Sequence, residues 1–337
     1  MTRARSVATL AGLLVALVAV AVVGLAAGGG TVTWAQTLRS VGTHLHLPVE
    51  PLPRLTDSIV WELRVPRVLL AAVAGAGLAA CGCVLQAVTR NALAEPYLLG
   101  VSSGASTGAV LVLVLGVGSG TLSLSAGALV GGLVSFGIVF LLMGRGPVTS
   151  SRIVLTGVVV GQLFSALTSL VVTAFGDADS TRGVTYWLLG SLAAARWSSV
   201  LLCTVVVVVA AAAFQLVAPS LDALSFGQDT AVTLGIDVRA LRVVVLVGAA
   251  AATAAIVAAV GAIGFVGLIV PHAARRLVGP GHRLLLPVSL LAGGAFLVLA
   301  DLLGRVAFAP QQIPVGVVTA LVGVPAFLIV LRRREVA

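Results

Sequence analysis

Long apolar runs alternate with short polar segments along almost the whole chain. A helix needs about 20 predominantly apolar residues to cross the hydrocarbon core of a bilayer, and windows of that length identify ten candidate spans. They cover residues 7–27, 66–88, 96–116, 121–143, 153–175, 197–217, 241–261, 263–279, 284–304 and 313–331. The eighth is the shortest, and the pattern from Ala249 to Val278 can also be divided in other ways. The pattern predicts an all-α, polytopic membrane protein in which residues 1–337 form one transmembrane domain.

Two longer polar segments separate the spans, an outer loop at residues 28–65 and an inner segment at residues 218–240. Within the inner segment, a polar island from Leu221 to Asp237 holds three of the chain's eleven acidic residues. Apolar residues recur there at spacings of three, four and seven, which is typical of an amphipathic helix. They are Leu221, Leu224, Ala231, Leu234 and Val238. An amphipathic helix beside a membrane predicts a protein partner. A different outer segment, Gly176 to Trp197, is expected to form a short helix at the membrane interface.

The composition supports a membrane protein, because 59% of the residues are hydrophobic, 9% are charged and the mean hydropathy is +1.18. All twenty basic residues are arginine. With the N-terminus in the cytoplasm, thirteen arginines lie inside and seven outside, and the positive-inside rule favours this orientation. We therefore expect a multi-pass protein of the cytoplasmic membrane with both termini inside. The net charge of +9 reflects this topology and contact with membrane lipid, so no nucleic-acid partner is predicted.

The first apolar run also fits a cleavable signal peptide at first sight, because Arg3 and Arg5 precede it and Leu25-Ala26-Ala27 ends it. A signal peptide carries an apolar region of about 7–15 residues. The run at residues 7–27 is longer than that. We therefore expect a retained membrane span.

The residues offer little support for catalysis or ion coupling. The chain contains no lysine, so it cannot hold a P-loop of the form G-x-x-x-x-G-K-[ST] and cannot itself be a P-loop ATPase. Secondary transport normally uses acidic or histidine residues inside the membrane, whereas Glu62, Glu95 and Asp301 all stand near span ends. A secondary transporter or channel that needs no ATPase stays open as an alternative. A membrane-embedded enzyme is disfavoured because no pair of nucleophile and base is evident.

Metal binding is not predicted either. His44 and His46 form an H-x-H pair in the outer loop, but two ligands do not make a metal site, and a plain polar loop is the favoured interpretation. His272 has no acidic residue or cysteine at zinc-ligand spacing. The three cysteines all fall inside predicted spans, and neither a disulfide nor a metal site is expected from them.

Some arginines lie in the predicted outer segments, where the positive-inside rule makes arginine less common. Arg64 and Arg67 open the second span and, at i and i+3, share one helix face. Their ordinary role is to reach the membrane interface, but a rigid outward pair also suits the carboxylates of a soluble partner. Arg305 is a third candidate, and Asp301 four residues before it can pair with it.

Glycines recur at every fourth position in some of the predicted spans. Gly100, Gly104 and Gly108 follow this spacing in the third span, and Gly127 and Gly131 follow it in the fourth. Small residues at this spacing let membrane helices approach closely. The spacing predicts helix packing rather than a direct role in transport.

Short motifs follow one another in order from about Glu62 to the C-terminus. They are Arg64-Val-Pro-Arg67, Gly75-Ala-Gly-Leu-Ala, Gln86, Asn91-Ala-Leu-Ala-Glu-Pro-Tyr-Leu-Leu-Gly-Val-Ser-Ser-Gly-Ala105, Trp187 with Gly190-Ser-Leu192 and Trp197, the polar island, Gly261-Ala-Ile-Gly-Phe-Val-Gly-Leu-Ile-Val-Pro-His272, and Ile313-Pro-Val-Gly-Val317 through to Pro325. Together they resemble the FecCD-like permeases, the membrane subunits of type II ABC importers for iron chelates, haem and cobalamin. One departure is Ala92, where the family commonly has proline, and this change softens the turn before the third span.

The resemblance implies a permease of the type II importer fold, with about ten helices, that forms a homodimer or heterodimer around a central pathway. Two cytoplasmic ABC ATPase subunits would bind below it, and an extracytoplasmic substrate-binding protein would dock above it. ATP and magnesium would be held by the ATPases. No cofactor, metal or enzymatic activity is expected on this chain. A ferric siderophore is the expected cargo from the breadth of the family, with haem and cobalamin as alternatives.

The resemblance also implies roles for particular residues. Arg64, Arg67 and Arg305 match positions at which relatives receive acidic residues of the binding protein. The loop between the fourth and fifth spans is an inner gate in relatives, which here points to Thr149, Ser150 and Ser151. The polar island matches the coupling helices that sit in the ATPase cleft. Contacts with the ATPase are expected from Leu221, Asp222, Leu224, Gly227, Gln228, Leu234 and Gly235.

Overall fold

The computed structural model describes residues 3–27, 32–118, 123–144, 149–307, 309 and 311–332. These residues form helices and include no strand. Ten helices correspond in position to the ten predicted spans. They are α1 (Arg3–Ala26), α4 (Val65–Val88), α5 (Val101–Leu115), α6 (Leu124–Met143), α7 (Ser150–Phe175), α9 (Trp197–Leu216), α12 (Val238–Val260), α13 (Val266–Val278), α14 (His282–Val306) and α15 (Val315–Arg332). The predicted all-α fold class is confirmed.

Not all ten helices are long enough to cross a bilayer by themselves. Within the described residues, seven stretches are long and apolar enough, judged by length and composition. They are Ala4–Ala26, Arg54–Val88, Leu124–Met143, Ser150–Phe175, Trp197–Leu216, Val238–Val260 and His282–Val306. Val101–Leu115 and Val315–Leu328 are apolar but shorter. The predicted eighth span is α13, which has 13 residues and cannot reach across the hydrocarbon core alone.

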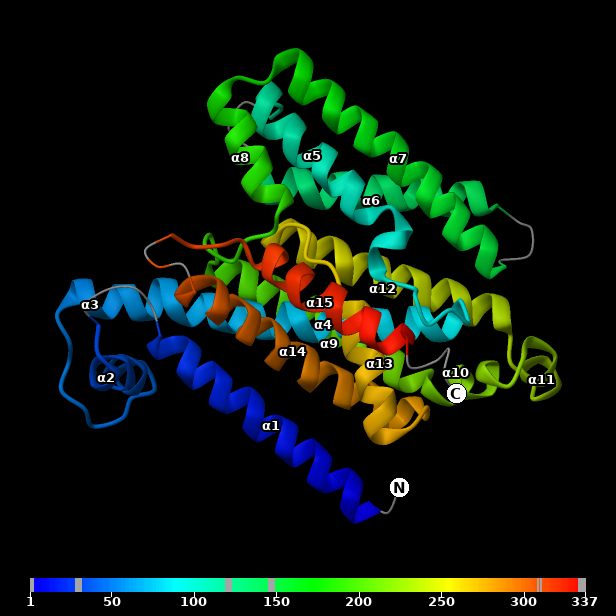
Figure 1. Cartoon of the computed structure of the whole chain (residues 1–337), viewed down its shortest axis with the longest axis horizontal. Helices are drawn as coiled ribbons and strands as arrows, with labels where there is room; N and C mark the ends of the chain where they lie inside the picture. The colour runs from blue at the N-terminus through cyan, green and yellow to red at the C-terminus, as the bar shows by residue number, and fades with distance from the viewer. Residues whose placement is uncertain are drawn as a thin grey trace.

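The long helices run between two ends of the molecule (Figure 1). At one end lie α2 (Trp34–His44), α3 (Arg54–Ser58), the π-helical turn η1 (Ile59–Arg64) and α8 (Ala178–Leu188). At the other lie α10 (Ala218–Ser225) and α11 (Gln228–Thr233), and here α1 begins and α15 ends. We name these the α2 end and the α10 end. The segments predicted to be outer thus share the α2 end, and the polar island lies at the α10 end.

The third predicted span is divided into two helical segments. Pro96–Leu99 form a single 3₁₀ turn, η2, and α5 begins only at Val101. Between them Gly100 adopts the left-handed conformation, with φ of 72°, which residues other than glycine rarely adopt. The prediction of one continuous helix over residues 96–116 is therefore wrong at its start.

The eighth predicted span also begins late, because the backbone from Gly261 to Phe265 is not helical. Side chains of the η2 segment satisfy this backbone. Glu95 accepts a hydrogen bond from the Phe265 N–H at 2.6 Å, and the Tyr97 hydroxyl accepts one from the Ile263 N–H. Irregular backbone at membrane depth is tolerated where protein groups satisfy its hydrogen bonds. The η2 segment and the start of α13 are thereby joined.

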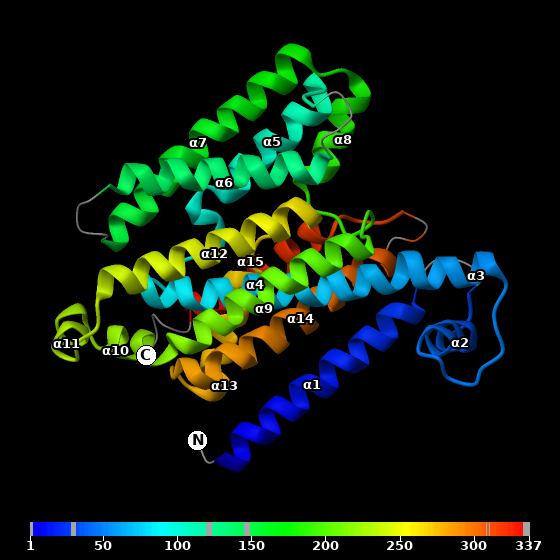
Figure 2. The same cartoon turned by 180° about the vertical axis from the view of Figure 1, so that it is seen from behind.

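α4 lies inside the bundle, between α9, α12, α13 and α14 (Figures 1 and 2). It packs backbone to backbone against α13, because a Cβ atom added to Gly82 would stand 1.9 Å from the carbonyl oxygen of Gly267. The predicted glycine packing between the third and fourth spans is confirmed in the same way. A Cβ atom on Gly104 would lie 2.4 Å from the carbonyl oxygen of Gly131. Glycine at these positions sets the distance between the helices.

The described part of the predicted outer loop, residues 28–65, is largely helical. α2 begins with a capping box in which Thr33 and Gln36 satisfy each other's backbone N–H groups. At its other end, the His44 ring stacks on Trp61 at 4.0 Å and its Nε2 lies 3.0 Å from a carboxylate oxygen of Asp57. The interpretation of His44 as part of a plain polar loop is therefore wrong, because the ring fastens α2 to η1.

α8 is the short helix predicted within Gly176 to Trp197. Asp177 caps its first turn by accepting a hydrogen bond from the Ser180 N–H at 2.7 Å. Hydrogen bonds from Ser180 lower the pKa of Asp177, because they favour the ionised carboxylate. The polar residues of this segment thus begin a helix, which confirms that a short helix forms here, while its place at the membrane interface stays a prediction.

Candidate functional site

Three arginines gather at the α2 end, and two of them, Arg67 and Arg305, pair with one carboxylate. Arg67 donates to Asp301 through Nε at 3.0 Å and through Nη2 at 2.8 Å. Arg305 Nε lies 3.0 Å from the other oxygen of Asp301. The Asp301 side chain is 2% exposed, so this is a buried ionic cluster. The predicted pairing of Asp301 with Arg305 is confirmed, and Arg67 joins it.

Two of the arginines also hold the end of α1. Arg64 donates to the carbonyl of Leu25 at 3.1 Å, and Arg305 donates to the carbonyls of Gly24 and Ala27 at 2.9 and 2.6 Å. The last carbonyls of a helix have no partner within the helix and carry its partial negative charge. The two guanidinium groups therefore fasten the first span to η1 and α14.

These contacts correct the expectation that Arg64 and Arg67 form an exposed outward pair. Arg64 is 7% exposed and Arg305 is 8% exposed, because both reach inward to α1. Arg67 retains some access at the surface and also donates to Gln312 at 2.8 Å. The structure thus brings Arg64, Arg67 and Arg305 together, while docking of a binding protein on them stays a prediction.

The polar island forms two helices rather than the single helix that its periodicity predicts. α10 and α11 are separated at Gly227, whose φ of 127° is open to glycine alone among ordinary residues. Leu221, Leu224 and Ala231 are fully buried, as the apolar stripe predicts. Leu234 is 65% exposed, so its predicted place on the buried stripe is wrong. The chain turns again at Gly235, with φ of 79°.

Some large apolar side chains of this segment do not fit the spacing of the buried residues and are exposed instead. Phe226 is 81% exposed and Val232 is 56% exposed, close in sequence to Leu234. The sequence interpretation missed Phe226 and Val232 because it counted only residues that fit one helix. Their signal was present as large apolar residues within a polar segment. This exposed set, Phe226, Val232 and Leu234, is named the island surface.

Asp222 and Gln228 contact other parts of the chain. One carboxylate oxygen of Asp222 lies 2.8 Å from the His282 N–H and 2.6 Å from its Nδ1. His282 begins α14 and is 2% exposed. Gln228 accepts a longer hydrogen bond from Arg242, at 3.5 Å. Asp222 therefore ties α10 to the first residue of α14, which the sequence did not indicate.

Replacing Asp222 with alanine is expected to loosen α10. A hydrogen bond to a charged group contributes about 1.5–3 kcal/mol, so amide hydrogens of residues 218–225 should exchange about tenfold faster or more. Hydrogen–deuterium exchange followed by mass spectrometry measures this. Asp229→Ala is the matched control, since Asp229 is an exposed acid of the same island. Equal exchange in the wild type and in Asp222→Ala would contradict the proposed tie.

The predicted gate residues lie at the start of α7. Thr149 caps this helix by accepting a hydrogen bond from the Arg152 N–H at 3.4 Å, and Ser150 and Ser151 form its first turn. Residues 145–148 of the same connection lie outside the described residues. The residues are at the α10 end, and their role as a gate stays a prediction.

The profile of the FecCD transport family matches residues 13–333. The chain belongs to the FecCD family. The match covers both the arginine cluster and the polar island, so the resemblance in the motifs extends over nearly the whole sequence. Among the described residues of this FecCD permease, no group of three or more histidine, cysteine, aspartate or glutamate side chains could hold a metal ion.

Curated relatives of the FecCD chain are permeases of importers for different cargoes. The chain is 39% identical over 291 residues to the cobalamin import system permease protein BtuC of Halobacterium salinarum, over 85% of this chain and 76% of that protein. It is 33% identical over 295 residues to the iron-uptake system permease protein FeuC of Bacillus subtilis, over 85% of this chain and 87% of that protein. The chain is thus a multi-pass membrane transport permease.

A solved structure agrees with this assignment. It is described as an inward-facing conformation of a metal-chelate type ABC transporter, and it matches the FecCD chain with a TM-score of 0.83 and 31% identity. The match covers 96% of this chain and 98% of that chain. Family, relatives and fold together identify a permease of the type II, metal-chelate class of ABC importers.

Proposed function

We propose that a separate cytoplasmic ATPase binds the α10 end and drives this permease through the polar island. The observation that carries the proposal is the island surface, since Phe226, Val232 and Leu234 are all more than half exposed. Large apolar side chains that stay exposed within one short segment favour a protein partner. The chain has no lysine and therefore no P-loop, so ATP and magnesium would be held by the ATPase subunits.

We further propose that two permease subunits, identical or different, enclose the pathway. α7 supports this because it exposes polar side chains along one side, Gln162, Ser165 and Ser169. Ser165 also donates to the Ser103 hydroxyl of α5 at 3.4 Å. Polar side chains of a membrane-spanning helix are expected to face a cavity or a partner rather than lipid. Thr149, Ser150 and Ser151 would close such a pathway at the α10 end.

The arginine cluster is the proposed docking place of an extracytoplasmic binding protein. Arg67 is the member that such a protein reaches first, because Arg64 and Arg305 are turned toward α1. Carboxylates of the docking protein would then compete with Asp301 for the Arg67 guanidinium. Docking could in this way act on the contact between α4 and α14.

The cargo is proposed to be a metal chelate. A ferric siderophore, expected from the breadth of the family, is the first candidate to test. Cobalamin and haem are the alternatives, and the 39% identity to the cobalamin permease makes cobalamin the first of these two to test. The assay is uptake of radiolabelled ferric siderophore or cobalamin into vesicles that contain the permease, its ATPase and its binding protein. Uptake that proceeds equally without ATP or without the ATPase would overturn the proposal in favour of a secondary transporter.

Substitution at the two turns of the island should separate ATP hydrolysis from transport. Gly227→Val or Gly235→Val forces a β-branched residue into a left-handed backbone, at φ of 127° or 79°, and so changes the direction of α11. We expect the assembled importer to retain ATPase activity while uptake falls at least tenfold. Parallel assays of phosphate release and uptake in vesicles measure both. Gly281→Val is the control, since Gly281 has φ of −64° and open space around its Cα at the same end. Normal coupling in both island variants would count against the proposed role.

A further inference from the structure

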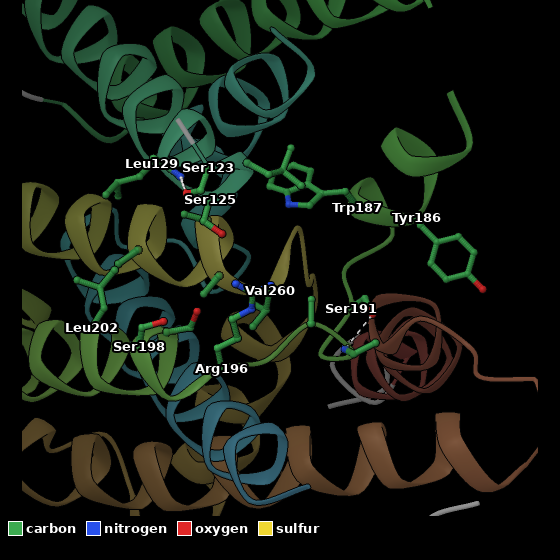
Figure 3. Close-up of a pocket in the computed structure, with 18 of the residues that line it drawn as sticks. Ser123, Ser125, Leu129, Tyr186, Trp187, Ser191, Arg196, Ser198, Leu202 and Val260 are labelled. Carbon is green, nitrogen blue, oxygen red and sulfur yellow. Dashed lines mark hydrogen bonds between the residues drawn. The ribbon is translucent and has the colours of Figure 1, made fainter. Parts of the chain in front are cut away.

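A cavity of about 680 Å³ lies at the α2 end (Figure 3). The starts of α6 and α9, the end of α8 and the end of α12 line it. It therefore lies where the α5 to α8 group of helices meets α9 and α12 (Figures 2 and 3). The arginine cluster, the gate residues and the island do not contribute to its lining.

Two of the polar side chains directed into the cavity, Arg196 and Trp187, can only donate hydrogen bonds. The Arg196 guanidinium, the Trp187 indole and the Ser125 hydroxyl turn toward the same space, whereas Tyr186 points away (Figure 3). No acidic side chain lines the cavity among the described residues. Arg196 is exposed and Trp187 is partly exposed, so both side chains are accessible to a ligand in the cavity. A cation with further donors around it is suited to an anionic oxygen ligand.

The start of α9 adds to this positive potential. Arg196 is the N-cap residue of this 20-residue helix, and no side chain caps the first turn. Ser198 and Ser199 in that turn line the cavity. The first amides of a helix lack partners within the helix and carry a partial positive charge. Together with the Arg196 side chain they favour a phosphate group at this position.

The rest of the cavity wall is apolar. Leu129, Leu202, Ala255 and Ala258 line it beyond the donors. α9 continues from there with an exposed apolar side, formed by Leu201, Val205, Val208 and Val209. An exposed apolar side on a membrane-spanning helix is suited to contact with lipid. The cavity thus joins an anion-binding end to a surface that hydrocarbon chains would cover.

We propose that this cavity binds a membrane phospholipid, whose phosphate contacts Arg196, Trp187 and the start of α9 while an acyl chain lies against Leu129 and Leu202. Basic pockets between membrane helices bind lipid head groups in this way. A free phosphate ion would use the donors but leave the apolar wall uncovered. Because the lipid touches both groups of helices, its binding stabilises their junction at the α2 end.

The test uses the purified, delipidated full-length chain and native mass spectrometry with phosphatidylglycerol as the probe. The variant is Arg196→Gln with Trp187→Phe, which removes the charge and the indole N–H while keeping side-chain size. We expect at least tenfold weaker binding of the tightest phosphatidylglycerol molecule, since a hydrogen bond to a charged group is lost. Arg182→Gln is the matched control, because Arg182 is an exposed arginine of α8 that does not line the cavity. It should bind as the wild type does.

Two further probes distinguish the source of the phosphate. Dioleoylglycerol, which has acyl chains without phosphate, should bind the wild type at least tenfold more weakly than phosphatidylglycerol. Millimolar inorganic phosphate should leave the lipid bound. Equal lipid binding by variant and wild type, equal binding of dioleoylglycerol, or displacement of lipid by phosphate would each overturn the proposal. If the double variant does not fold, Trp187→Phe alone carries the same test.

Discussion

Replacing Asp301 with alanine is expected to destabilise the folded permease by about 3–5 kcal/mol, because removing one partner of a buried ion pair leaves uncompensated charge. Its carboxylate lies 2.8 Å from Arg67 and 3.0 Å from Arg305. Without it the two guanidinium groups repel each other, and Arg305 is too buried to regain water. Thermal unfolding of the purified protein in a single detergent measures the loss.

Asp179→Ala is the matched control for this experiment. Asp179 is an exposed carboxylate on α8, at the same end of the molecule. Surface substitutions of this kind usually change stability by about 0.5 kcal/mol or less. If Asp301→Ala unfolded at the wild-type temperature, the carbonyls of α1 would be sufficient to hold Arg305, and Gln312 sufficient to hold Arg67. The central role given to Asp301 would then be wrong.

Replacing Gly82 with valine is expected to prevent α4 and α13 from packing as they do. The atoms nearest to an added Cβ are the carbonyl oxygen, carbonyl carbon and Cα of Gly267, at 1.9, 2.5 and 2.6 Å. They belong to backbone and cannot rotate away, so the helices must separate. Overpacking of a close interior costs about 1–3 kcal/mol or more. Size-exclusion chromatography and thermal unfolding should show a low yield of folded, monodisperse protein.

Gly137→Val provides the comparison. Gly137 lies in the long helix α6, and no atom comes within 4 Å of the place where its Cβ would stand. This variant carries the same change in helix propensity without the clash, so it should be recovered in nearly normal yield. Similar behaviour of the two variants would mean that propensity, and not the approach of α4 to α13, explains the defect.

The positions of the helices could be predicted from hydropathy because lipid imposes one simple demand. A chain crossing it must be apolar on its surface and must satisfy its own backbone hydrogen bonds. Helices such as α9 and α14 therefore begin and end close to the predicted windows. Hydropathy does not predict the breaks at Gly100 and at Gly261–Phe265, because neighbouring protein segments satisfy the backbone hydrogen bonds there.

The sequence indicates which residues belong to the candidate sites, but not which of their side chains are exposed or what they contact. Periodicity favours one helix through the polar island, yet the conformation of Gly227 divides it and leaves Phe226 exposed. The position of Arg64 in the sequence suggests an outward side chain. Its partners are carbonyls at the end of α1, and contacts between separate helices leave no periodic signal in either one. The cavity beside Arg196 depends on four elements at once, so no local pattern could indicate it.

The fastening of α13 at both ends has a mechanical consequence. Glu95 and Tyr97 hold the backbone before its first turn, while the short link from Gly279 leads to His282, which Asp222 holds in place. A displacement of α10 along the long axis of the molecule would therefore be transmitted to η2 through α13, because both ends of this short helix are held by hydrogen bonds. α13 would then couple movement at the α10 end to movement of the helices around α5.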